Sequence, residues 1–196
     1  MPQRTALSNW LPAATAGLAV VLLAGCGFQL RGAPPVSTAL QPLAVTCADD
    51  VPELLCQSVR SQLELGDVDL QETGNARYVM KLGDFQQDRR ASAITVQAAA
   101  AEYTLRHSVS LELISADQIP IIADTRLTST ESYRYDETNV LAKQREEEEL
   151  RAQLSDRLAQ QIIFRLAPLT ETRIETIRDD YQAEVDQQST EGDGTP

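Results

Sequence analysis

The chain has 196 residues, 42% of them hydrophobic, and a formal net charge of −12. After removal of an export signal, this length still suits one domain of ordinary size. The acidic balance argues against nucleic-acid binding, because counterion release from a nucleic acid requires a basic protein face.

An export signal is the first predicted element. One basic residue, Arg4, precedes an apolar run at residues 11–23, and the small residues Ala24 and Gly25 follow. This order is typical of a secretory signal. The apolar run is too short for a bilayer core of about 30 Å, which takes about 20 helical residues. We therefore predict a signal peptide at 1–25 rather than a membrane anchor.

The signal ends in Leu-Ala-Gly-Cys (residues 23–26), which resembles the lipobox of bacterial lipoproteins. The resemblance implies cleavage before Cys26, diacylglycerol on its thiol and acylation of its amino group. Several acyl chains give stable anchoring, whereas one chain binds only marginally. Gly27 follows where an aspartate would retain the lipoprotein, so we expect an outer-membrane protein, lipid-anchored on the periplasmic side through a tether at 26–39. With one histidine and no paired CxxC, we expect no metal and no cofactor besides this lipid.

A strand, a helix and a short strand are expected next, at residues 40–46, 52–65 and 68–70. The helix has apolar residues at helical spacing and ends at Gly66. Export makes a disulfide between Cys47 and Cys56 feasible. Cys56 lies in the apolar stripe, so a buried free thiol remains the alternative. The residues of the stripe are Leu55, Cys56, Val59 and Leu63.

A β meander follows. Alternation begins at Tyr78, and the polar run at residues 86–90 favours a turn. The alternation at residues 103–113 is the clearest in the chain and predicts a half-solvated antiparallel strand. His107 falls on its apolar side and is interpreted as a packed core histidine. A further strand is expected at residues 119–132.

The last regular element is a long helix. Leucines and isoleucines step by four from Leu150 to Leu166, Leu141 widens the stripe, and Pro168 ends it. Residues 146–149 are interpreted as solvated first turns, where acidic groups favour the helix dipole. The predicted fold is α+β, with two helices packed on one face of a mixed four- to five-stranded sheet over residues 40–170. The acidic stretch 171–196 has little to bury towards its end and is expected to be largely disordered.

Several motifs together resemble the LptE family of lipopolysaccharide-assembly lipoproteins. They are a lipobox running into Cys-Gly-Phe-Gln-Leu-Arg-Gly (26–32), Ala-Glu-Tyr (101–103) before a long strand, and Tyr133 followed by Asn-Val-Leu-Ala-Lys (139–143) at a helix entry. The resemblance covers roughly residues 26–169. It implies a non-enzymatic protein that plugs and helps assemble the LptD outer-membrane β-barrel and assists lipopolysaccharide delivery to the outer leaflet.

The resemblance also suggests residues for lipopolysaccharide contact. Lys143 matches the position of the family's lipopolysaccharide-contacting lysine, while Arg89 and Arg90 lie at the predicted turn. The family also uses an arginine shortly before Ala-Glu-Tyr, but residues 95–100 here hold no basic side chain. Lipopolysaccharide is itself anionic, so binding requires a local basic cluster against the net field.

Two other classes of function are alternatives to this interpretation. One is an auxiliary envelope lipoprotein of another transport system, with a periplasmic partner. The other is a lipid-anchored hydrolase, against which the sequence offers neither a GxSxG nor an HExxH arrangement. The motifs at 26–32 and 139–143 favour the LptE-like plug.

Overall fold

A computed structural model describes residues 36–94, 100–135 and 139–192, and all structural statements concern these residues. Four strands form one mixed sheet in the order β1-β2-β3-β4, with β1 parallel to β2 and the other pairs antiparallel. The strands are β1 (Leu43–Cys47), β2 (Tyr78–Ile94), β3 (Ala100–Ser115) and β4 (Pro120–Arg134). The predicted α+β fold with a mixed sheet is confirmed.

Helix α2 (Glu53–Leu65) connects the parallel strands β1 and β2. Its four apolar stripe residues are buried, and Gly66 caps its end by donating its backbone N–H to carbonyls of the last turn. Two short 3-10 helices flank this unit, η1 (Thr38–Leu40) and η2 (Thr73–Asn75). The strand expected at 68–70 is reduced to a single bridge between Leu43 and Leu70, so the sheet has four strands rather than five.

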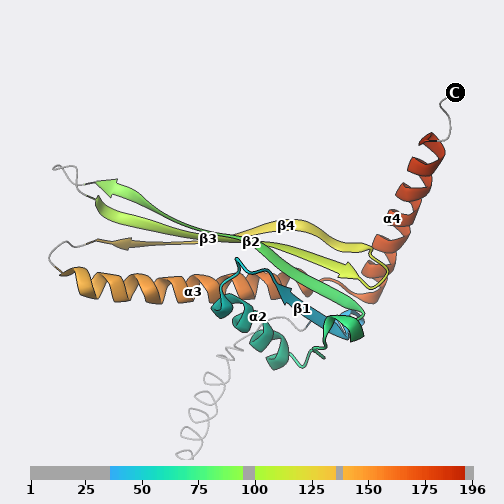
Figure 1. Cartoon of the computed structure of the whole chain (residues 1–196), viewed down its shortest axis with the longest axis horizontal. Coiled ribbons are helices and arrows are strands. Elements are labelled where there is room, and N and C mark those ends of the chain that lie inside the picture. Colours follow the sequence, from blue (N-terminus) through green and yellow to red (C-terminus); the bar gives the residue numbers. More distant parts are fainter. Residues whose placement is uncertain (1–35, 95–99, 136–138, 193–196) are drawn as a thin grey trace, which may run out of the picture. The chain divides into compact units, whose positions relative to one another are not determined.

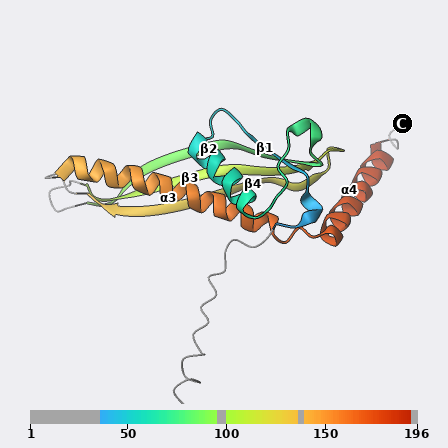
Figure 2. The same ribbon diagram turned by 90° about the horizontal axis from the view of Figure 1, so that it is seen from below.

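Helix α3 (Val140–Leu166) lies along the sheet on the same face as α2 (Figures 1 and 2). Its stripe is buried from Leu154 to Leu166, and the helix stops two residues before Pro168, as expected. Leu141 is 75% exposed, so its predicted place in the stripe is wrong. The first two turns therefore reach beyond the main core.

The core divides into a large and a small cluster along α3. The large cluster joins α2, the C-terminal half of α3 and the helix-facing side of the sheet. Each fully buried leucine in it contributes roughly 1.5–3 kcal/mol of hydrophobic free energy. The small cluster lies beneath the N-terminal half of α3 and consists of Leu105, Tyr133 and Leu154, with Tyr103, Tyr135 and Leu150 against it.

Residues 86–90 form part of β2, which corrects the predicted polar turn. A bulge between Gly83 and Gln86 shifts the register, and β2 then continues paired with β3 as far as Ile94. This part of the strand is polar because much of it is exposed, not because the chain turns there. The correction moves Arg89 and Arg90 from a loop into a strand.

Helix α4 (Glu171–Gly192) replaces the largely disordered tail expected from the sequence. Its first turns are tied to the domain: Ile174 is 4% exposed in the large cluster, and Arg178 donates to both oxygens of Asp117 at 2.7 and 3.0 Å. From Asp179 to Gln188 every side chain is exposed. Composition alone missed the two anchoring contacts, which both lie before residue 179.

Candidate functional site

Arg89 lies on the helix-facing side of β2, because it pairs with the buried Leu105 of β3. Its guanidinium carbon stacks 3.7 Å from the ring centroid of Tyr103. Nε donates to the hydroxyl of Tyr133 at 3.1 Å and lies 3.3 Å from a carboxylate oxygen of Glu147 on α3. The guanidinium therefore contacts an aromatic ring, a hydroxyl and a carboxylate, while its side chain stays 38% exposed.

Glu147 is the acceptor at the centre of this group. Its side chain is 13% exposed and accepts hydrogen bonds from the Tyr133 hydroxyl and from Arg151. We call Arg89, Tyr103, Tyr133, Glu147 and Arg151 the Arg89 cluster. It joins strands β2, β3 and β4 to the N-terminal half of α3, so the interpretation of residues 146–149 as solvated turns is wrong for Glu147.

The Arg89 cluster shifts the pKa of two of its members. Burial, together with the hydrogen bond to Glu147, raises the pKa of Tyr133 to about 12. Burial acts to lower the pKa of Arg89, but the hydrogen bond with Tyr133 and the charge of Glu147 outweigh it and raise that pKa. Both groups are held in their protonated forms at neutral pH, which is suited to anchoring α3.

Lys143 lies one helical turn before Glu147 in the first turns of α3. Its ammonium is 2.7 Å from a carboxylate oxygen of Glu146, and its side chain is 21% exposed. Arg90, in contrast, pairs with Thr104 on the opposite face of the sheet, where it is exposed. The structure therefore brings Arg89 to Glu147, one helical turn after Lys143 on α3, and leaves Arg90 on the other face of the sheet.

Two further arginines share the open face with Arg90. Arg106 and Arg134 are exposed on β3 and β4, on the side of the sheet that the helices leave uncovered. Arg106 is not among the residues that the sequence predicts to contact lipopolysaccharide. The available signal was the alternation itself, which puts Arg106 on the same face as Thr104.

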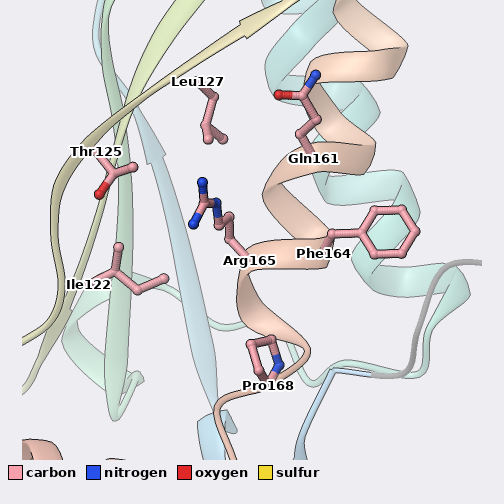
Figure 3. A pocket seen from close by; sticks show the side chains of 7 residues that line it. All are labelled: Ile122, Thr125, Leu127, Gln161, Phe164, Arg165 and Pro168. Atoms are coloured by element: carbon pink, nitrogen blue, oxygen red, sulfur yellow. The ribbon is translucent and has the colours of Figure 1, made fainter.

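A pocket of about 510 Å³ opens between β4 and the end of α3. Figure 3 shows the Arg165 side chain between the helix and the strand, with Phe164 projecting away from β4. Phe164 is 57% exposed. None of the residues predicted from the sequence to contact lipopolysaccharide lines this pocket. The lining residues are Ile122, Thr125, Leu127, Gln161, Phe164, Arg165 and Pro168.

The cysteines and His107 complete the set of predicted residues. Cys47 and Cys56 form a disulfide that joins the end of β1 to α2, while Cys26 lies outside the described residues. His107 is 2% exposed, as expected for a core histidine, and packs edge-on against Phe85. Neither ring nitrogen has a hydrogen-bond partner within the described part of the chain.

The described residues include neither a membrane-spanning helix nor a cluster of metal ligands. None of the described helices has the length and apolar character needed to cross a membrane. Within the same ranges, histidine, cysteine and acidic side chains form no group able to hold a metal ion.

Comparison with solved structures supports the fold. A rare lipoprotein B from Shewanella oneidensis superposes with a TM-score of 0.57 at 24% identity, covering 64% of this chain and 93% of that one. A minor lipoprotein from Acinetobacter baumannii gives a TM-score of 0.55 at 23% identity, covering 64% and 90%. At this identity the likeness concerns the fold alone.

Comparison of sequences identifies the family as well as the fold. The model of the family described as "LptE: Lipopolysaccharide-assembly" matches residues 40–166. The LPS-assembly lipoprotein LptE of Photorhabdus laumondii is 34% identical over 152 residues, which cover 75% of this chain and 82% of that relative. The protein of the same name from Yersinia pestis strain Pestoides F is 30% identical over 154 residues, covering 76% and 72%. The chain therefore belongs to the LptE family of lipopolysaccharide-assembly lipoproteins.

Proposed function

We propose that this protein occupies the lumen of an LptD-type outer-membrane β-barrel, helps that barrel to assemble and assists lipopolysaccharide delivery to the outer leaflet. Its role is that of a binding and scaffolding protein rather than an enzyme. Acyl chains on Cys26 hold it on the periplasmic side of the outer membrane. The family match over residues 40–166 is the observation that carries the proposal.

The surface of the domain is compatible with a wet barrel lumen. The uncovered face of β2–β4 carries hydroxyl and charged side chains, including Lys81 paired with Glu112 and Arg126 paired with Asp84. Polar faces of this kind can lie against the water-lined interior wall of a large barrel. The helices leave this face free for such a contact because α2 and α3 cover the other one.

The partnership is tested by a pull-down from outer membranes in mild detergent with the tagged, lipidated protein as bait. We expect a large β-barrel protein to co-elute in stoichiometric amount. The Cys26→Ala variant should lose its membrane location but keep the wild-type melting temperature. A folded bait without a barrel would contradict the plug and favour an auxiliary lipoprotein of another transport system.

Lipopolysaccharide contact is tested separately at Lys143. Lys143→Asp reverses a charge near the start of α3, and we expect it to weaken lipopolysaccharide binding about tenfold with little loss of stability. Arg145→Asp is the matched control, because Arg145 is an exposed cation in the same helix turn. Equal losses in the two variants would mean that only net charge matters and would contradict a specific role for Lys143.

A further inference from the structure

Three arginines surround a pair of hydroxyl groups on the uncovered face of the sheet. Residues that pair across strands share a face, and those two apart along a strand also do so. Arg90 pairs with Thr104, Arg106 is two residues along β3 from it, and Arg134 is two residues along β4 from its other partner, Ser132. The hydroxyls of Thr104 and Ser132 are 2.8 Å apart. We call Arg90, Arg106 and Arg134 the distal arginine surface.

The spacing of the sheet brings these three side chains within reach of one ligand. Neighbouring strands are about 4.8 Å apart, and alternate residues along a strand are about 6.7 Å apart. Arginine side chains are long enough to converge across such distances onto one phosphorylated saccharide unit. The central hydroxyl pair can donate to and accept from the same ligand.

The distal arginine surface differs from the rest of the same face in its pairing. Nearer to β1, Lys81 lies 3.5 Å from Glu112 and Arg126 lies 3.4 Å from Asp84, so each cation there has an acidic partner. The three distal arginines form no ion pair among the described residues. Their guanidinium groups are therefore available to an external anion.

Acidic neighbours lie close by but leave these arginines unpaired. Asp88 pairs with Arg106 and Glu102 pairs with Arg134 in the strand register, yet neither comes within ion-pair distance of its partner. Glu102 instead accepts a hydrogen bond from Ser92 at 3.0 Å. The patch thus combines strong donors for phosphate with carboxylates that can accept from sugar hydroxyls.

We propose that the distal arginine surface binds the phosphate groups of a phosphorylated glycolipid, on the face of the sheet opposite to α3 and Lys143. This rests on the proposed function and adds a second contact surface to it. The planar guanidinium matches phosphate oxygens in a bidentate way. The three arginines offer donors for phosphate oxygens, while the two carboxylates and two hydroxyls can bind the hydroxyl groups of a saccharide.

The net charge of the protein makes local contact necessary. With a formal charge of −12, the chain as a whole repels anions at distances within the Debye length, about 8 Å at physiological salt. Binding at the distal arginine surface must therefore come from direct guanidinium–phosphate hydrogen bonds. Such binding depends on the phosphate groups themselves and weakens as salt increases.

The test uses the full lipidated protein in detergent and two sets of charge-neutral variants. One combines Arg90→Gln, Arg106→Gln and Arg134→Gln; the control combines Lys81→Gln and Arg126→Gln on the paired part of the same face. Dissociation constants are measured for lipopolysaccharide and for the same material after removal of its phosphates. Melting temperatures verify that both variants fold.

We expect the triple variant to bind lipopolysaccharide at least about tenfold more weakly, which corresponds to one lost charge-assisted hydrogen bond. The control variant should lose less than about threefold. Removing the phosphates should weaken binding to the wild type more than binding to the triple variant, which keeps Lys143 as its proposed cationic contact. Single Arg106→Gln and Arg134→Gln variants replace the triple variant if the latter does not fold.

Three results would overturn the inference, and they differ in their meaning for the proposed function. Unchanged affinity of the triple variant for lipopolysaccharide would show that the distal arginine surface is not a binding site, and lipopolysaccharide would then bind elsewhere on the protein. Normal lipopolysaccharide binding with loss of the co-purifying barrel would assign the surface to the protein wall. No binding by the wild type would exclude direct lipopolysaccharide contact, while barrel co-purification would still support the plug.

Discussion

Replacing Glu147 with alanine tests whether the Arg89 cluster holds the N-terminal half of α3 on the sheet. The substitution keeps a strong helix former in the helix, so the intrinsic helix preference does not fall. It removes the acceptor for Tyr133 and Arg151 and the ion-pair partner of Arg89. The substitution removes two contacts between α3 and the sheet, those with Arg89 and Tyr133, and one i,i+4 pair with Arg151 within the helix.

The size of the effect follows from the exposure of the three donors. The side chains of Arg89 and Arg151 are 38% and 39% exposed, so water can replace the carboxylate and each loss is worth at most about 1 kcal/mol. Tyr133 is 4% exposed, and weakening the pairing of its hydroxyl costs about 1 kcal/mol. We expect a total of about 1–3 kcal/mol, concentrated in α3 before Leu154.

Two measurements check this prediction. Urea unfolding gives the free energy, and amide hydrogen exchange locates the loss, which should appear at residues 140–150 and not in α2. Glu148→Ala is the control, since it removes an exposed carboxylate from the next position of the same helix. If Glu147→Ala costs no more than Glu148→Ala and leaves exchange unchanged, the cluster does not anchor the helix.

Three further predictions concern stability. His107→Leu should raise the melting temperature, because it removes a buried ring whose nitrogens lack partners among the described residues. Burial lowers the pKa of His107, so the stability of the wild type should fall as the pH drops below 6.5. The variant should lose this contribution to the pH dependence of stability. Replacing Cys47 and Cys56 by alanine opens a short loop, which on the chain-entropy account costs about 2.5 kcal/mol, and urea titration with and without reductant measures it. The pKa of Tyr133 is raised to about 12, so stability should decline between pH 10 and 12; Tyr133→Phe should abolish that decline, and an identical alkaline profile in the variant would contradict it.

Local patterns predicted much of the fold. Alternation identified the strand around Val109, and helical spacing identified α2 and the buried end of α3. These elements could be predicted because each has one buried side, so that apolar residues recur along the sequence with the period of the strand or of the helix. The disulfide could only be left open, because whether two thiols meet depends on how α2 packs on β1.

The site was harder to predict for a related reason. Arg89 and Glu147 are ordinary surface charges in sequence, and their partnership arises only when α3 folds back over β2. A polar run such as residues 86–90 favours a turn when read alone, but the same residues form a strand once β3 supplies the hydrogen bonds. The Arg89 cluster therefore depends on contacts between residues far apart in the chain, which no short stretch of sequence reveals.

The packing of α2 against α3 has a consequence for how an exported chain reaches its folded state. β1 and α2 emerge first, yet their apolar side is completed by Leu158, Ile162 and Leu166, and Ser58 of α2 donates to Asp156 at 2.8 Å. A chain that stops before Val140 would leave that side and the sheet beneath it in water, open to proteases. The apolar side of β1 and α2 is therefore buried only after synthesis and translocation have continued through α3, and incomplete chains stay exposed to degradation.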